Sequence, residues 1–415
     1  MRRSKRVMAS ANYFSERVLG ELRESGGNSA WNKLLKLSKE PGVVNLGQGF
    51  PNYQGSKVAR EAAAAALTDS SLAAFNQYSM PQGMNTLLDS ICKYYNKIIE
   101  EAGGQVIAPS NLLITAGATE ALFVALDALV GPGDEVITYD PGFPWYASSI
   151  RLAGATPVFL ELQGPAFAPD FKALREAITP KTKVMLLNTP QNPTGYCYTL
   201  DDVKEFAAIA KEHDLVVISD EVYENCLFNG LKHYRISDQP DMFDRTLTIC
   251  SASKLFSLTG WRVGWVIGPD SLMKGLGLVH VATTYCAPSP FQHGLTSALD
   301  AEAAIKADVD SFEGIPSLIE GNAQVLGKAL EEKGFTVSWP GGGHFLMAKS
   351  TALGSDGMEC AMKLLEEVKL SCVPGDIFYA AESKTPRPPY LRFAICKTRE
   401  TISEAAARIA ALDLS

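Results

Sequence analysis

One lysine in this sequence stands where it could act as a nucleophilic amine. Lys254 follows an apolar run, 246–250, and three small residues, 251–253, and Arg262 comes eight residues after it, before a second apolar run. An amine held among small and apolar residues can lose its charge and attack a carbonyl carbon. For a lysine taken alone the alternative is a solvated loop position, because most lysines are exposed. The decision between the two depends on what other loops bring to the same place.

A second stretch could bind a phosphate group. The run 112–115 predicts a buried strand, and Gly117-Ala118-Thr119 follows it at the start of an apolar helix. A strand, small residues and a helix start present free backbone N–H groups and the positive end of the helix dipole to an anion. The alternative is an ordinary turn capped by Thr119. The donors offered to a phosphate are then the amides of Gly117, Ala118 and Thr119, the hydroxyls of Ser251 and Ser253, and the guanidinium of Arg262.

Four further side chains could bind a pyridine ring. A carboxylate at Asp220 would keep a ring nitrogen protonated, which makes the ring a better electron sink. Asn192 and Tyr223 can hydrogen-bond a ring hydroxyl, and Phe143 can stack on the ring face. Each residue also has an ordinary structural role open to it, as a cap, core or turn residue, but all such roles holding at once is improbable. The set matches a phosphorylated pyridine aldehyde, with which Lys254 can form a Schiff base.

These residues share one position relative to the predicted strands. Apolar strands alternate with helices, a pattern typical of a mostly parallel sheet with helices on both faces. In such sheets ligands bind beyond the carboxyl ends of the strands. We therefore expect five strand-end loops to converge on one crevice: those that carry Gly117, Phe143, Asn192, Asp220 and Lys254.

The last third of the sequence has a different character. Predicted helices lie at 301–334, broken at Gly314, and at 358–369 and 399–412. Short strands are predicted at 335–340, 344–349, 371–373 and 390–395. This mixture is typical of a smaller α+β domain.

Composition excludes several classes of protein. With 415 residues, a net charge of −8 and no apolar run long enough to cross a bilayer, the sequence predicts a soluble protein that binds neither nucleic acid nor membrane. The eight cysteines form no CxxC and no histidine pair has metal-ligand spacing, so we expect reduced thiols and no metal site. The basic N-terminus has no acidic residue before Glu16. We expect a frayed terminus on a cytoplasmic protein, with organellar targeting as the alternative.

Three segments resemble the signatures of the class I/II pyridoxal-phosphate-dependent aminotransferases. Residues 251–264 match the family's cofactor-attachment signature position by position, and 192–195 and 220–223 match two others. The resemblance extends from about Trp31 to the last helix. It implies the α/β fold of type I, with a mostly parallel seven-stranded sheet, helices on both faces and a smaller α+β domain. The implied cofactor is pyridoxal 5′-phosphate.

Within this family the chain is most similar to the kynurenine aminotransferase I / glutamine transaminase K group. The run 45–51, Asn-Leu-Gly-Gln-Gly-Phe-Pro, is that group's form of the N-terminal loop. Arg392 is implied to grip the substrate carboxylate, because its planar fork suits a bidentate carboxylate. Gly49 and Asn192 are implied substrate contacts on the carboxylate side, and Trp31 a wall of the side-chain pocket.

The resemblance also implies an assembly. Tyr78 matches a tyrosine that reaches the phosphate of the neighbouring subunit, so we expect a homodimer with shared active sites. The small domain would combine the N-terminal segment with the end of the chain. The implied division is 1–55 for that segment, 56–305 for the large cofactor-binding domain and 306–415 for the small domain.

Two positions depart from the group's pattern. Thr119 stands where these proteins often have an aromatic residue, and Cys286 where a histidine aligns. Both would line the substrate pocket and make it less aromatic. No second arginine is clearly placed for a side-chain carboxylate, which disfavours aspartate as the amino donor.

The function expected from these residues is transamination. The amino group of a neutral or aromatic L-amino acid, of the kynurenine or glutamine type, would pass to a 2-oxo acid in two half-reactions. Lys254 would hold the cofactor and then move the α-proton as general base and acid.

Three alternatives remain. A β-lyase acting on cysteine S-conjugates and an aspartate- or alanine-type aminotransferase would use the same cofactor residues, so only the products and donors separate them. A cofactor-binding regulator would carry an added helix-turn-helix domain. The chain has no room for such a domain before Trp31 and no basic surface for it.

Overall fold

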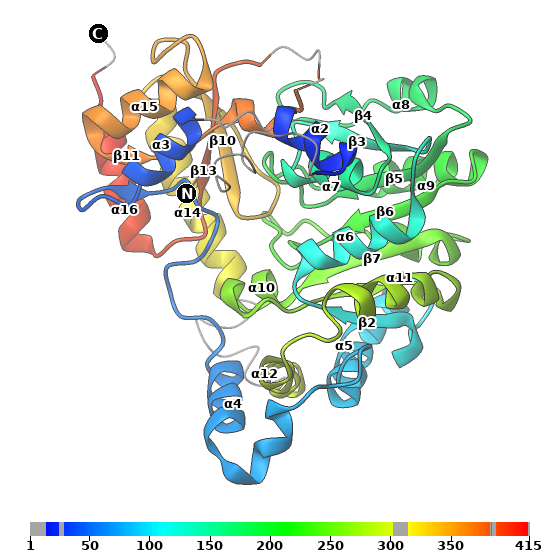
Figure 1. Ribbon diagram of the computed structural model, residues 1–415. Helices are drawn as coiled ribbons and strands as arrows, with labels where there is room; N and C mark the ends of the chain where they lie inside the picture. The colour runs from blue at the N-terminus through cyan, green and yellow to red at the C-terminus, as the bar shows by residue number, and fades with distance from the viewer. Residues whose placement is uncertain (1–13, 25–28, 302–313, 382, 384–386, 414–415) are drawn as a thin grey trace, which may run out of the picture.

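The computed structural model describes residues 14–24, 29–301, 314–381, 383 and 387–413; at 23, 24 and 29–31 only the backbone is described. A larger α/β unit carries the middle of the chain, and a smaller unit combines segments from both ends (Figure 1). Within the described ranges, no helix is long and apolar enough to cross a membrane.

The larger unit is built on a seven-stranded sheet in the order β2-β8-β7-β6-β5-β3-β4. Strand β8 runs antiparallel to both of its neighbours, and the other neighbouring pairs are parallel. The prediction of a mostly parallel seven-stranded sheet is therefore confirmed. The strands are β2 (Leu112–Thr115), β3 (Glu135–Asp140), β4 (Thr156–Glu161), β5 (Thr182–Asn188), β6 (Val216–Asp220), β7 (Thr246–Ser251) and β8 (Gly264–Ile267).

Helices cover both faces of this sheet because successive strand residues point to opposite sides. In β5, Val184 and Leu186 join a core with α6, α7 and α11, whereas Met185 and Leu187 join a core with α8 and α9. Helices α4, α5 and α12 pack beside β2, β7 and β8 in a third core. The helices of this unit are α4 (Lys57–Thr68), α5 (Asn85–Ala102), α6 (Ala118–Leu129), α7 (Trp145–Leu152), α8 (Phe171–Ala177), α9 (Leu200–Glu212), α10 (Ala252–Leu255), α11 (Asp270–Thr283) and α12 (Ser289–Asp300).

The smaller unit has its own core around a four-stranded antiparallel sheet of order β12-β13-β10-β9. Leu34, Val44 and Leu46 from the start of the chain join residues of the last third in this core. Its elements are α3 (Ser29–Leu37), β1 (Val44–Asn45), α14 (Gly314–Glu332), β9 (Thr336–Ser338), β10 (Phe345–Lys349), α15 (Gly357–Val368), β11 (Leu370–Ser371), β12 (Val373–Pro374), β13 (Tyr390–Ala394) and α16 (Arg399–Ala410).

One predicted element of the last third differs in the structure. The single strand predicted at 371–373 is two strands, because Ser371 pairs with Asn45 of β1 whereas Val373 pairs with Arg392 of β13. The chain thus leaves one sheet and enters another at Cys372. Of the helical stretch predicted at 301–334, the part after the predicted break at Gly314 is α14, and residues 302–313 lie outside the described part, so the prediction is not tested there.

The first described helix, α2 (Glu16–Glu24), packs on the larger unit. Arg17 Nη1 donates to the Leu152 carbonyl oxygen at 2.5 Å, and Glu21 pairs with Arg151 of α7. Helix α2 therefore lies against the larger unit, whereas α3 contributes Leu34 to the core of the smaller unit.

Candidate active site

The predicted cofactor residues gather around one cavity at the carboxyl ends of the central strands. It encloses about 690 Å³ of empty space, counting the part open to solvent. Its lining includes ten of the predicted side chains: Ala118, Thr119, Phe143, Asn192, Asp220, Tyr223, Ser251, Ser253, Lys254 and Arg262. The five strand-end loops therefore converge as expected from the sheet topology.

Lys254 enters the cavity from α10, directly after β7. Ser251 caps this short helix, because its hydroxyl accepts a hydrogen bond from the Ser253 amide at 3.2 Å. The Lys254 Nζ lies 3.4 Å from the Gly49 carbonyl oxygen and 5.6 Å from the Tyr223 ring centre. Burial lowers the pKa of the lysine below its usual value. A larger share of the amine is therefore neutral and able to attack a carbonyl.

One end of the cavity is arranged for an anion. Gly117 precedes α6 with φ +83°, so the helix begins at Ala118 and the alternative of a turn capped by Thr119 is wrong. The first amides of a helix have no intrahelical acceptor. Arg262 lies against Gly117, and the buried Ser253 hydroxyl has no hydrogen-bond partner among the described residues. These donors lie at the same end of the cavity, where they could bind a phosphate group.

Asp220 lines the cavity at the end of β6. Its carboxylate accepts hydrogen bonds from the Tyr146 hydroxyl at 2.5 Å and from the Val222 amide at 3.3 Å. Burial raises the pKa of the Asp220 carboxyl to about 6, and these two hydrogen bonds act in the opposite direction. Such a carboxyl gains from a cationic partner, which is what a protonated ring nitrogen offers. The sequence placed Tyr146 in the aromatic loop after β3 but contained no signal that pairs it with Asp220.

Asn188 was also missed. Its side-chain nitrogen donates to the Asp220 carbonyl oxygen at 2.8 Å, and its side-chain oxygen accepts from the Asn192 amide at 2.8 Å. Asn188 therefore ties the end of β5 to the end of β6 and holds the two loops that carry Asn192 and Asp220. Its signal was weak, because it is the last residue of a predicted strand and precedes the family motif.

Arg392 reaches this region from β13 of the smaller unit. Its Nη1 donates to the Asn192 side-chain oxygen at 2.9 Å and its Nη2 to the Gly47 carbonyl oxygen at 3.0 Å. The guanidinium lies 3.8 Å from the Phe345 ring centre, and burial lowers its pKa to about 10. Among the described residues it has no carboxylate partner, and Nε has no acceptor. A buried guanidinium in this state is able to bind an incoming carboxylate.

Two predicted side chains, those of Tyr78 and Cys286, lie outside the cavity lining, and a third, that of Trp31, is not described. Tyr78 is 84% exposed and its ring meets the Tyr285 ring edge-on at 5.4 Å. Cys286 is half-buried beside Tyr285 and lies away from the cavity lining. The side chain of Trp31 lies outside the described part of the structure, so its predicted role stays a prediction.

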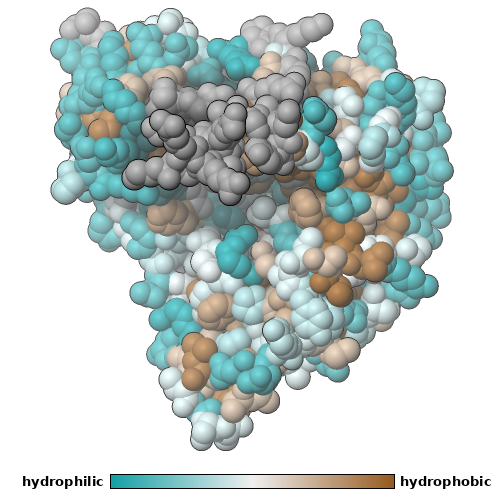
Figure 2. Space-filling view, viewed as in Figure 1, coloured by the Kyte–Doolittle hydropathy of each residue, from teal (hydrophilic) through white to brown (hydrophobic). Residues whose placement is uncertain are grey.

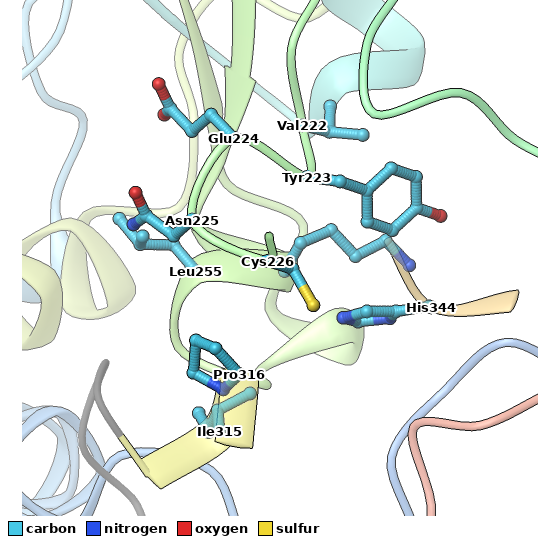
Figure 3. A pocket seen from close by; sticks show the side chains of 10 residues that line it. Val222, Tyr223, Glu224, Asn225, Cys226, Leu255, Ile315, Pro316 and His344 are labelled. Atoms are coloured by element: carbon cyan, nitrogen blue, oxygen red, sulfur yellow. The ribbon is translucent and has the colours of Figure 1, made fainter. Parts of the chain in front are cut away.

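A smaller hollow adjoins the cavity and shares Val222, Tyr223 and Lys254 with it. Cys226 and His344 also line it, as Figure 3 shows. His344 is buried, and its Nδ1 has no hydrogen-bond partner among the described residues. Burial lowers the pKa of this imidazole well below its usual value, so the ring is neutral. The sequence carried no signal that would place His344 beside the lysine.

The sequence also gave no sign of a cluster of ionisable side chains next to the site. Glu221, Glu224 and His233 lie with their ligand atoms within 4.8 Å of one another. Arg235 pairs with both carboxylates, and the Tyr95 hydroxyl donates to Glu224. The single positive charge of Arg235 offsets part of the negative charge of the two carboxylates, and His233 contacts Glu221 at 2.6 Å.

Taken together, the residues that line the cavity offer an amine, an anion site and a carboxylate. The unpartnered Ser253 hydroxyl, the open start of α6 and the raised pKa of Asp220 fit a phosphorylated pyridine aldehyde. Asn192, Tyr223 and Phe143 also line the cavity, where such a ring could contact them.

Comparisons with known proteins agree with this geometry. The family model for aminotransferase class I and II matches residues 41–409. The chain is 34% identical to kynurenine–oxoglutarate transaminase 3 of Rattus norvegicus, over 91% of this chain and 86% of that protein. It is 33% identical to kynurenine–oxoglutarate transaminase 1 of Mus musculus, over 94% and 96% respectively.

Solved structures of similar fold include two aminotransferases. A methionine aminotransferase of Escherichia coli superimposes with a TM-score of 0.85 at 28% identity, covering 93% of this chain and 97% of that one. The N-succinyldiaminopimelate aminotransferase of Mycobacterium tuberculosis superimposes with a TM-score of 0.87 at 32% identity, covering 96% and 100%.

Proposed function

The chain belongs to the class I and II aminotransferases, and we propose that it moves the amino group of a neutral or aromatic L-amino acid to a 2-oxo acid. It is a pyridoxal-phosphate-dependent transaminase of fold type I. The observation that carries the proposal is the position of Arg392, a buried guanidinium held by Asn192 and not neutralised by any described carboxylate. It offers the substrate α-carboxylate one binding site within reach of the cofactor residues.

We assign the cofactor residues as follows. The cofactor supplies an aldehyde that links to an amine and a ring that accepts electrons. Lys254 provides the amine, and Asp220 holds its negative charge toward the ring nitrogen. Phe143 would pack against the ring, and Asn192 and Tyr223 would hydrogen-bond its hydroxyl. The phosphate would be held by Gly117, Ala118, Thr119, Ser251, Ser253 and Arg262, and by Tyr78 of a second subunit.

The proton on the substrate α-carbon is moved by Lys254. Its lowered pKa favours the neutral amine, which can accept the proton and later return it to another atom. Asp220 would support this step, because a carboxylate beside the ring nitrogen would keep it protonated and so stabilise the negative charge that develops. Arg392 and Gly49 orient the substrate so that its α-carbon faces the amine.

The donor class rests on what surrounds Arg392. One arginine, Arg262, is found among the described residues that line the cavity, and we assign it to the phosphate site. A second carboxylate on the substrate would therefore enter without a cationic partner, a costly arrangement. We propose donors of the kynurenine, glutamine and aromatic type, and kynurenine is the donor in the names of the relatives.

A panel of amino acids in single turnover tests the donor class. The absorbance of the bound cofactor is followed after mixing with kynurenine, glutamine, phenylalanine, aspartate or glutamate. We expect the first three to convert the cofactor at least about tenfold faster than the two acidic donors, because one unpaired carboxylate in a binding site costs more than one factor of ten. A response confined to aspartate and glutamate would contradict the donor class. Release of pyruvate and ammonia from a cysteine S-conjugate, without amino transfer, would favour the β-lyase alternative.

We also propose that two copies of the chain form a homodimer with shared sites. Apolar side chains gather on the surface where α6 and α11 lie (Figure 2). The exposed apolar residues of this region and of the loop before α5 are Tyr78, Met80, Leu278, Val281 and Tyr285. An exposed apolar surface of this kind fits a second copy of the chain. Tyr78 projects from it and would reach the partner's phosphate site.

Mixing two inactive variants tests the sharing of sites. In a hybrid of Lys254→Ala and Tyr78→Phe, one site has both lesions and the other has neither. Random reassociation makes about half of the dimers hybrids, so we expect about a quarter of wild-type turnover to return. No gain above the sum of the separate variants would mean that Tyr78 acts in its own subunit or in none.

Two further expectations belong to this proposal. We propose the division into 1–55 with 306–415 as the small domain and 56–305 as the large one. We also propose a cytoplasmic protein, with targeting by the basic N-terminus as the alternative. A fluorescent fusion of residues 1–18 would separate the two, since a targeting segment would carry the reporter into an organelle.

A further inference from the structure

A buried lysine outside the cofactor site has no partner of opposite charge. Lys397 follows β13 and is 2% exposed. Its Nζ donates to the carbonyl oxygens of Gln48 at 3.0 Å and Phe50 at 2.7 Å, and it lies 4.4 Å from the Phe50 ring centre. Within the described part of the chain no carboxylate pairs with it. Burying an ammonium without a counter-ion is costly, so these contacts require an explanation.

The two carbonyl groups flank Gly49, in a loop that contacts lysine and arginine side chains at each residue from 47 to 50. Arg392 donates to the Gly47 carbonyl oxygen, Lys397 to those of Gln48 and Phe50, and Lys254 to that of Gly49. All four carbonyl groups from 47 to 50 thus accept from the side chain of a lysine or an arginine. Hydrogen bonds from charged donors are stronger than neutral ones, so the loop is firmly oriented.

The amides of the same loop are used unequally. The N–H groups of Gly47 and Gln48 both donate to the Asn45 side-chain oxygen, at 3.0 and 3.3 Å. The Gly49 N–H has no acceptor among the described residues. The loop also has no room to shift toward β10, because an ideal Cβ on Gly49 would lie 2.3 Å from Cζ of Phe345. Gly49 is therefore held at a defined place, with its carbonyl oxygen 3.4 Å from the Lys254 Nζ.

We propose that Lys397 is a positioning residue: it holds the Gly49 loop against Arg392 so that the Gly49 N–H and the guanidinium bind the same substrate carboxylate. Lys397 lies five positions after Arg392, and both side chains attach to the same loop. These contacts thereby fix the two parts of the carboxylate site, the Gly49 N–H and the Arg392 guanidinium, relative to each other. This inference rests on the proposed function, which supplies the carboxylate.

Three variants of the holoenzyme test the role of Lys397. Lys397→Met keeps the length of the side chain and removes both hydrogen bonds, and Lys397→Arg keeps the charge and two donors. The control is Lys349→Met on β10, because Lys349 also lies over a ring of the smaller unit, 5.2 Å from the Tyr390 ring centre, but does not contact the loop. KM and kcat for the best amino donor are measured for each.

We expect Lys397→Met to raise KM for the donor at least about tenfold while kcat changes less than about threefold, because a loosened loop weakens carboxylate binding rather than the chemical step. Lys397→Arg should restore most of the affinity, and Lys349→Met should behave as wild type. Cofactor absorbance and its covalent attachment to Lys254 should be the same in all four proteins. An unchanged KM in Lys397→Met, or an equal change in Lys349→Met, overturns the inference.

A second measurement does not depend on turnover. Hydrogen–deuterium exchange of the holoenzyme reports the amides of 46–51 directly. We expect faster exchange there in Lys397→Met and no change in Lys349→Met. If the wild type fails to transaminate any donor, the proposed function fails, and exchange still decides whether Lys397 holds the loop. Unchanged exchange in Lys397→Met overturns that role.

Discussion

The guanidinium of Arg262 occupies the space that a β-carbon on Gly117 would need: an ideal Cβ there lies 2.5 Å from Nη2. Gly117 also has φ +83°, a conformation that L side chains rarely adopt. The backbone of Arg262 is also in the left-handed region, with φ +53°. Both halves of the predicted phosphate site are therefore held in conformations that ordinary turns avoid, and the close approach of arginine to the helix start depends on the missing side chain.

Replacing Gly117 by alanine should weaken cofactor binding. Displacing Arg262 removes a charged donor, and we expect the dissociation constant for pyridoxal phosphate to rise roughly 10- to 100-fold. Equilibrium titration of the cofactor-free protein measures it. The control is Gly133→Ala, since Gly133 has φ +97° but open space around its Cβ position. Equal weakening in both variants would show that backbone strain, and not the contact with Arg262, is responsible.

Replacing Lys254 by alanine should abolish covalent attachment. Borohydride reduction followed by unfolding should leave the cofactor on the wild-type chain and on none of the variant chains, although the phosphate donors still bind it. Transamination should fall at least about a hundredfold, because the proton-transferring amine is gone. Lys57→Ala, which alters an exposed lysine of α4, serves as the control. Covalent retention in Lys254→Ala would place the attachment elsewhere.

The affinity for the cofactor should depend on pH through Asp220. The pKa of this carboxyl is raised to about 6, so below that pH the cofactor-free protein carries a proton that must leave before the carboxylate can face a protonated ring. Affinity should therefore decline as the pH falls below about 6. Asp220→Asn lacks this titrating carboxyl. The dissociation constant of the variant divided by that of the wild type should therefore be constant above neutral pH and fall in acid. A constant ratio across the range would contradict this assignment.

Removing the Tyr146 hydroxyl should move that pH dependence. Its hydrogen bond to Asp220 lowers the carboxyl pKa, so Tyr146→Phe should shift the decline in affinity to higher pH. The same titrations at several pH values measure the shift. Tyr139→Phe is the control, because the buried Tyr139 hydroxyl has no partner among the described residues. A shift of equal size in the control would exclude the hydrogen bond as the cause.

Arg235 should matter for stability more than for chemistry. It is 5% exposed and pairs with Glu221 and Glu224, so Arg235→Met leaves two buried carboxylates without their cation. We expect the free energy of unfolding to fall by about 3–5 kcal/mol, measured by denaturant titration of the holoprotein. Arg175→Met breaks a half-exposed pair with Glu205 and should cost less than about 1 kcal/mol. Similar losses in both variants would mean that the buried pairing contributes little.

Much of the site could be predicted from the sequence because its main residues follow strands. The alternation of apolar strands and helices is a local signal, and it places Asn192, Asp220 and Lys254 directly after strands. Parallel strands end at the same edge of the sheet, so these residues come together there. The same reasoning predicted the mostly parallel sheet. It was wrong where a boundary depends on a distant partner, as at Cys372, where Ser371 and Val373 pair with different strands.

What only the tertiary structure decided are the contacts between segments far apart in the chain. Tyr146 reaches Asp220, His344 lies beside Lys254, and Lys397 holds the carbonyl groups on either side of Gly49. None of these pairs has a periodicity or a fixed spacing, because packing between sheets and units sets them. The sequence alone determined which groups carry the chemistry, since amines, carboxylates and helix starts act through their type and local position. The fold decided their pKa values and orientation, since burial and hydrogen bonding exist only once distant segments have packed together.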